Sequence, residues 1–144
     1  MKLPGRKKRT PYGVREPSVI RVPGFLSYVR KHECAVTVKF TFFCEGSTEA
    51  AHVRTGTDGG TGMKPSDCYA LPLCSGHHRR QHQIGEQQFE KDWGIDMRKI
   101  ADGMWAQWLK TTAGQNWKRK TGYTHHPGEN SATRRSPTST PMTT

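Results

Sequence analysis

The segment Leu73–His82 holds one cysteine and three histidines within ten residues, and this density strongly constrains the fold. Cys74 and His77 stand three positions apart, a spacing that suits one half of a tetrahedral zinc site. His78 and His82 stand four positions apart, so in a helix both imidazole rings project from one face and can bind one divalent cation. Because adjacent helix residues point about 100° apart, the two pairs need not share a metal. The segment therefore predicts a metal-binding fold.

The composition limits the classes of protein to which this chain can belong. Its 144 residues suit one compact domain, but only 32% of them are hydrophobic and the mean hydropathy is -0.85, so a large enzyme core is not expected. No apolar run approaches the roughly 18–20 residues that cross a bilayer. No apolar stretch follows the basic start, as it would in a secretory signal. We expect a soluble, cytoplasmic protein with no membrane partner.

The formal net charge of +11 is distributed unevenly along the chain. Residues 1–31 carry nine Lys/Arg and one acid (+8), residues 112–144 carry five and one (+4), and the segment between them carries nine and ten (-1). Residues 1–24 and 112–144 are predicted to be disordered basic arms that bind nucleic-acid phosphates. Solvated tails without a target are the alternative. The first arm contains the basic run Arg6, Lys7, Lys8 and Arg9.

The hydrophobic pattern between the arms predicts an α+β fold. Alternation of β-branched and aromatic residues with polar residues indicates a strand over 34–44. Shorter strands are expected at 49–53 and 69–73, on either side of a glycine-rich loop at 54–67. Cys68 is expected to be a small core residue. Helices are expected at 25–32, 76–83, 86–93 and 97–110, with Ser75 and Asp96 as N-caps of the second and the last.

The order of these elements is that of a known metal-binding motif. A strand with His52, a loop, a second strand and a helix with His77-His78-x-x-x-His82 resemble the ββα-metal finger of the HNH endonucleases. The loop GTDGGTGMKPSD and the helix GIDMRKIA extend the resemblance to residues 34–110, and look like those of phage and prophage HNH nucleases of the recombination-enhancement type. The resemblance implies a zinc-stabilised nuclease domain at 25–111, with its ββα core at about 49–83 and flanking helices.

The resemblance also implies a role for individual residues. His52 matches the general base that takes a proton from the attacking water, and a pKa near ~6.5 suits an imidazole to that work at neutral pH. His78 matches a ligand of the catalytic cation, Mg²⁺ or Mn²⁺, and His82 matches the further helical ligand of some members. Asp67 falls near the middle Asn of the motif, which braces the loop and thereby orients the base.

One position departs from the family pattern. The residue before the general base often helps to hold the metal, but here it is Ala51, which has no donor atom. Either the catalytic cation has two protein ligands together with water and phosphate, or Glu49, Asp67 or another group helps to bind it. Asp67 stands seven residues before Cys74, whereas the usual Asn stands about five before that position, so the role of Asp67 is less closely defined.

Cys34 and Cys44 are the candidate partners of Cys74 and His77 in a structural zinc site. They resemble a stretched version of the family's first cysteine pair, and His77 takes the place of the second cysteine of its C-x-x-C. Ten residues of straight strand span roughly 33 Å, so both thiolates reach one ion only if residues 35–43 fold back. The sequence permits a hairpin there but lacks an Asn-Gly turn. A disulfide is disfavoured in the cytosol.

Together these interpretations predict a metal-dependent endonuclease that hydrolyses DNA and leaves 5′-phosphate and 3′-hydroxyl ends. Its expected partners are DNA and a phage or recombination protein, in the bacterial cytoplasm if a phage encodes the chain. A non-catalytic, zinc-stabilised nucleic-acid-binding module is the alternative, and a scaffold that holds a partner through its tails is a third reading. Candidate DNA contacts, for which a solvated surface position is equally open, are Arg54, Lys64, Arg79 and Arg80.

Overall fold

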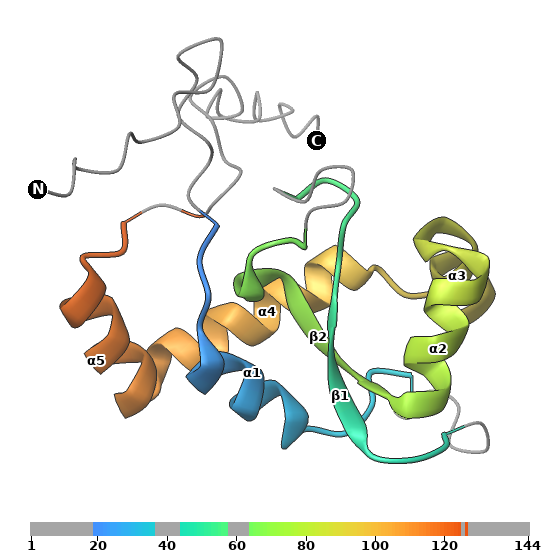
Figure 1. Ribbon diagram of the computed structural model, residues 1–144, viewed down its shortest axis with the longest axis horizontal. Coiled ribbons are helices and arrows are strands. Elements are labelled where there is room, and N and C mark those ends of the chain that lie inside the picture. The colour runs from blue at the N-terminus through green and yellow to red at the C-terminus, as the bar shows by residue number, and fades with distance from the viewer. Residues whose placement is uncertain (1–18, 37–43, 58–63, 125, 127–144) are drawn as a thin grey trace, which may run out of the picture.

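A computed structural model describes residues 19–36, 44–57, 64–124 and 126, which form a mixed α+β fold (Figure 1). In Figure 1 a small sheet lies between α2 and α3 on one side and α1, α4 and α5 on the other. The elements are, in chain order, α1 (Pro23–Arg30), β1 (Thr48–His52), the 3-10 helix η2 (Asp67–Tyr69), β2 (Ala70–Cys74), α2 (Ser75–Ile84), α3 (Glu86–Trp93), α4 (Met97–Lys110) and α5 (Thr112–Thr121).

The sheet consists of β1 and β2, which pair antiparallel with Thr48 opposite Cys74 and His52 opposite Ala70. Every residue of β2 is buried. An isolated two-stranded ribbon is marginally stable in water, so the sheet depends on the helices that pack against it. The register places His52 at the end of β1 and sets the start of α2 directly after the last pair of the sheet.

The core has two parts, and α4 contributes to both of them. Leu71 and Leu73 of β2 pack with Phe89 and Met97 in the first part. The second part is largely aromatic, and its buried rings are Phe25, Tyr69, Trp105 and Trp108. The helix expected at 97–110 is confirmed with its N-cap, since the Asp96 side chain accepts a hydrogen bond from Lys99 N. Cys68 is fully buried in the second part, as expected.

The start of α2 differs from the prediction by one residue. Ser75 is the first residue of the helix rather than its N-cap. The N-cap is Cys74, whose sulfur accepts the backbone N–H of His77 at 3.4 Å. The sequence favours serine at a cap because its hydroxyl is the commoner acceptor. Here the Ser75 hydroxyl instead donates to Glu49 Oε1 at 3.1 Å, across to β1.

The strand expected over 34–44 is wrong for the part of it that the structure describes. Cys34 has no regular structure, Ala35 and Val36 form a turn, and Cys44 precedes β1 without belonging to a strand. Residues 37–43 lie outside the described residues. Of the alternating hydrophobic residues, Val36 lies in the described part, where it is buried in the first part of the core and belongs to a turn.

Both expected arms extend too far into the fold. Residues 19–24 are not an arm, because Val22 is buried and Pro23 begins α1. Residues 112–121 are not a disordered tail, because they form α5, and Trp117 packs edge-on against Trp105 with ring centroids 5.3 Å apart. Burial of such aromatic rings stabilises a helix whose other residues are polar. Residues 1–18, with the basic run, and residues 127–144 lie outside the described residues.

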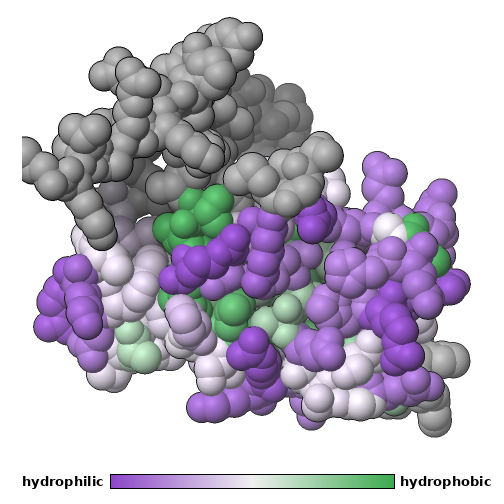
Figure 2. Space-filling view, viewed as in Figure 1, coloured by the Kyte–Doolittle hydropathy of each residue, from purple (hydrophilic) through white to green (hydrophobic). Residues whose placement is uncertain are grey.

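The described residues contain no helix that is long and apolar enough to cross a membrane. Hydrophilic residues cover much of the face shown in Figure 2, and the larger hydrophobic areas lie near its middle, with smaller ones elsewhere. This distribution fits the low proportion of hydrophobic residues in the sequence, many of which lie in the two parts of the core.

Candidate metal centre and adjoining cleft

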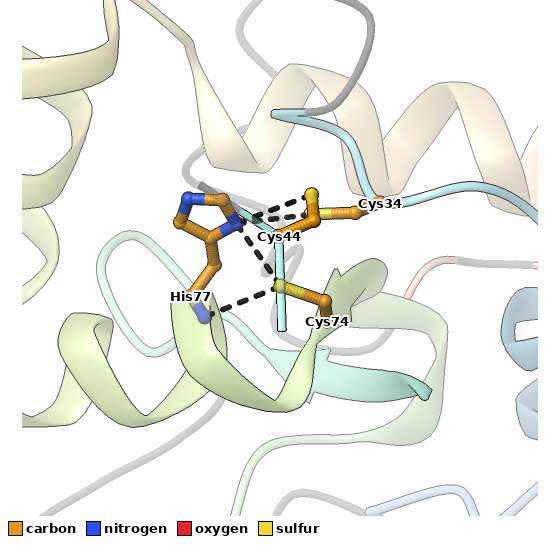
Figure 3. A group of neighbouring side chains, drawn as sticks. All are labelled: Cys34, Cys44, Cys74 and His77. Carbon is orange, nitrogen blue, oxygen red and sulfur yellow. Dashed lines mark hydrogen bonds between the residues drawn. The ribbon is translucent and has the colours of Figure 1, made fainter. Parts of the chain in front are cut away.

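Four side chains with metal-ligating atoms converge beside the start of α2 (Figure 3). Nδ1 of His77 lies 3.1 Å from Sγ of Cys74, 3.5 Å from Sγ of Cys34 and 3.7 Å from Sγ of Cys44. All four donor atoms lie within 4.8 Å of one another. A tetrahedral zinc ion separates such ligand atoms by about 3.5–3.8 Å. The predicted convergence is confirmed, and the four residues could hold a metal ion, compatible with structural zinc.

The chain after Cys44 is anchored to the beginning of α2, which brings this distant cysteine to the site. The first N–H groups of a helix have no acceptor within the helix. Backbone oxygens of the loop before β1 are the acceptors of two of these groups. Gly76 N donates to Glu45 O and Ser75 N donates to Ser47 O, each at 3.0 Å. These two hydrogen bonds place the segment that follows Cys44 beside the start of α2.

Burial and hydrogen bonding prepare these donors to bind a metal. Cys34, Cys74 and His77 are almost fully buried. Burial raises the pKa of the Cys74 thiol, but hydrogen bonds from the backbone N–H groups of His77 and Glu45 and from the thiols of Cys44 and Cys34 together outweigh this effect, and the pKa lies below its ordinary value. Burial lowers the pKa of His77, which favours the neutral imidazole that a metal requires. The His77 ring packs edge-on against Trp93, with centroids 4.9 Å apart.

His52 and Asp67, the two residues assigned to catalysis from the sequence, are in direct contact. Nε2 of His52 lies 3.0 Å from Oδ1 of Asp67, and the other carboxylate oxygen accepts the Val22 N–H at 2.7 Å. The side chains are 13% and 3% exposed. Since an ionised carboxylate only accepts hydrogen bonds, the neutral imidazole carries its proton on Nε2 and its lone pair on Nδ1.

The environment sets the charge of both members of this pair. Burial lowers the pKa of His52 below its ordinary value, and the hydrogen bond to Asp67 offsets only part of this effect. Burial raises the pKa of Asp67, but hydrogen bonds from His52 and Val22 and the charge of Arg21 outweigh it, and the pKa lies below its usual range. At neutral pH the pair is a neutral imidazole held by a carboxylate.

Glu49 of β1 and His78 and His82 of α2 form a second connected group. Nδ1 of His78 lies 2.7 Å from Oε2 of Glu49, and Nε2 of His78 lies 3.2 Å from Nε2 of His82. The predicted meeting of the two imidazoles on one helix face is confirmed. The hydrogen bonds from His78 and Ser75 lower the pKa of Glu49. A carboxylate on one ring nitrogen, with the other nitrogen free for an ion, is a common arrangement of metal-binding histidine.

The three histidines His52, His78 and His82 line one cleft of about 280 Å³, bounded by α1, β1, α2 and the segment before η2. Arg54 and Lys64, which were predicted to contact DNA, line the same cleft. The predicted contacts Arg79 and Arg80 are exposed on α2 and are not among the described residues that line the cleft.

Sequence reasoning missed the contributions of three side chains. Arg30 lines the cleft from the last turn of α1, and its charge at that helix end was the available signal. Glu49 was named with Asp67 as a group that assists the cation, but its bond to His78 was not predicted. Arg21 contacts Asp67 from a segment expected to be an arm, and no local pattern indicates this contact. Ala51 is fully buried and has no donor atom, as the sequence implied.

Comparison with known proteins places this geometry within one family. The profile of a family described as "Protein of unknown function (DUF968)" matches residues 15–114. The match includes the four residues of the metal centre and the residues that line the cleft. No curated protein and no solved structure matches the chain.

Proposed function

The chain belongs to the DUF968 family, whose function is unknown, and from its cleft we propose that it is a metal-dependent endonuclease that hydrolyses DNA phosphodiester bonds. One observation carries the proposal: a histidine oriented by Asp67 and a histidine pair oriented by Glu49 line a single cleft with basic side chains. The order β1, β2, α2, with His52 on β1 and His78 on α2, supports an HNH-type ββα finger as the fold of the site.

In this proposal His52 is the general base. The bond from Nε2 to Asp67 fixes the tautomer and leaves Nδ1 to accept a proton from the attacking water. The lowered pKa keeps the ring neutral at pH 7, so it is ready to accept that proton. Asp67 is a positioning residue that holds the ring and stabilises the imidazolium formed after proton transfer.

His78 and His82 are the proposed ligands of a divalent cation. Their Nε2 atoms face each other at 3.2 Å, and Glu49 holds the opposite nitrogen of His78. Mg²⁺ or Mn²⁺ bound there would stabilise the charge that develops on the scissile phosphate and on the leaving oxygen. With Ala51 unable to contribute, water and phosphate oxygens would supply the remaining ligands, and Glu49 would act by orienting His78.

DNA is the proposed substrate because the cleft presents positive charge to a phosphate backbone. Arg30, Arg54 and Lys64 line it beside the histidines. Such contacts position a duplex without reading its sequence. A role in phage or prophage recombination, with a protein partner in the bacterial cytoplasm, rests on the sequence resemblance alone.

The proposed activity is tested by nicking of supercoiled plasmid with the zinc-loaded full chain. We expect conversion to open-circular and linear DNA with added Mg²⁺ or Mn²⁺, and none after chelation with EDTA. The variant His78→Ala should lose the activity because it removes a cation ligand. Gln83→Ala, a change at an exposed position of the same helix, should keep the activity. A contaminating nuclease would instead leave both variants active. Absence of cutting by folded protein with any divalent cation tested would overturn the proposal.

The pH profile should report the state of His52. Because burial lowers the pKa of His52 below its ordinary value of 6.5, the ring stays neutral until the pH falls below that value. We expect kcat/KM to fall with a midpoint below pH 6.5, as protonation removes the base. Repeating the profile at several Mg²⁺ concentrations separates this fall in kcat/KM from one caused by protonation of the cation ligands. A metal-independent midpoint above pH 6.5 contradicts the assignment.

A non-catalytic nucleic-acid-binding module is the second candidate. The observation that favours it is Ala51, which is buried and lacks the donor atom that the family often places there. In that case the basic cleft binds phosphate, and the histidines that line it have no catalytic role in a zinc-stabilised fold. DNA binding that persists in His52→Ala, with no cleavage by the wild-type protein, would select this function.

A further inference from the structure

The short segment Ile20–Val22 runs beside the segment Lys64–Asp67 just before α1 begins. Asp67 N donates to Ile20 O at 3.0 Å, and Ile20 N donates to the Ser66 hydroxyl oxygen at 3.0 Å. Val22 N completes the set by donating to the Asp67 carboxylate at 2.7 Å. The two segments therefore form one hydrogen-bonded unit, although more than forty residues separate them in the chain.

Arg21 closes this unit with its guanidinium group. Nη1 donates to Pro65 O at 2.6 Å, and Nη2 donates to Lys64 O at 3.1 Å. Nη1 also lies 3.3 Å from Oδ1 of Asp67. A planar guanidinium with five donors suits such simultaneous contact with two carbonyl oxygens and a carboxylate, which a lysine cannot reproduce.

These contacts hold both oxygens of Asp67. Oδ2 accepts the Val22 N–H, and Oδ1 lies within reach of both Arg21 and His52. The Asp67 side chain is 3% exposed, and a buried carboxylate is costly unless it is paired and hydrogen-bonded. With both oxygens engaged, the carboxyl group cannot turn freely, and its direction fixes the imidazole that it accepts.

We propose that Arg21 is a positioning residue of the cleft, which fixes the Asp67 carboxylate and through it the ring of His52. The inference rests on the proposed nuclease function for its effect on catalysis. Its structural part, the order of the His52 ring, stands independently. The Arg21 side chain is 45% exposed, so direct contact with a DNA phosphate is the competing role, and support of the fold alone is a third.

Steady-state cleavage by the zinc-loaded full chain separates these roles. For Arg21→Met we expect kcat to fall about 10- to 100-fold with little change in KM, because the base is misplaced rather than the substrate lost. Arg21→Lys should restore part of kcat through its charge. The matched variant Arg30→Met, which removes a cleft cation that does not hold Asp67, should raise KM instead. An Arg21→Met variant that matches Arg30→Met identifies Arg21 as a phosphate contact and overturns the proposal.

A second readout does not depend on activity. Proton–nitrogen NMR of histidine-labelled protein should show the Nε2–H of His52 as a downfield, slowly exchanging resonance. We expect this signal to broaden or vanish in Arg21→Met while circular dichroism and zinc content stay as in the wild type. An unchanged signal, or its loss only together with global unfolding, overturns the positioning role. A wild-type protein that shows the signal but cuts no DNA rejects the nuclease function, and the Arg21→Met spectrum still decides the inference.

Discussion

Replacing Cys74 with alanine is expected to abolish zinc binding by the chain and, with it, the folded state of the domain. Structural zinc contributes about 10 kcal/mol or more to small metal-binding folds. This is comparable with the whole unfolding free energy of an ordinary domain, about 5–15 kcal/mol. Cys74 is also the N-cap of α2 and the acceptor of two backbone N–H groups. Zinc content by mass spectrometry and thermal unfolding by circular dichroism measure the two losses.

Cys68→Ala is the matched control for this experiment. Cys68 is also buried, but it lies in the aromatic part of the core and is not one of the four converging ligands. This variant should keep one equivalent of zinc and lose only the modest stability of a removed sulfur atom. Addition of EDTA to the wild type should reproduce the Cys74→Ala phenotype. A Cys74→Ala protein that retains stoichiometric zinc and its wild-type melting temperature rules out the proposed metal centre.

Replacing His52 with glutamine is expected to reduce DNA cleavage about 10²- to 10⁴-fold, the usual contribution of a general base. The glutamine amide can still donate to Asp67, so the buried carboxylate keeps a partner and the fold should persist. Because the amide cannot accept a proton, catalysis is lost without loss of positioning. The loss should appear in kcat, while DNA affinity measured by fluorescence anisotropy should stay close to that of the wild type.

His32→Gln is the appropriate control for general effects of removing a histidine. His32 follows α1, where its Nδ1 lies 2.8 Å from Tyr28 O, and it is not among the described residues that line the cleft. This variant should cleave at the wild-type rate. His52→Ala extends the test, since added imidazole should restore part of its activity through the space that the ring leaves. Wild-type cleavage by His52→Gln would remove His52 from the mechanism.

Much of the central fold was predictable because its signals are local. Asp96 and the apolar stripe after it define α4, and the spacing of His78 and His82 is sufficient to bring their rings together. In each of these cases, a residue type and a short spacing carry the information.

The parts that were missed depend on contacts between distant segments. α5 is a polar helix whose stability comes from Trp117 packing on α4, and Gly114 permits the close turn, since a Cβ there would lie 2.0 Å from Trp108 O. Arg21 acts on residues more than forty positions away. The residues around Cys34 alternate like a strand, yet the metal centre needs them to turn. Propensity does not encode such tertiary pairings.

The adjacent histidines of α2 have different neighbours, and this has a consequence for the geometry of the cleft. His77 is one of four converging ligands, together with Cys74 one helical turn earlier, whereas His78 lines the cleft. A metal held by both Cys74 and His77 prevents the helix from rotating about its axis or sliding along it. Since successive residues differ by about 100° in azimuth, the direction of His78 is then determined. A bound zinc ion would set the angular position of the cleft histidines without touching them.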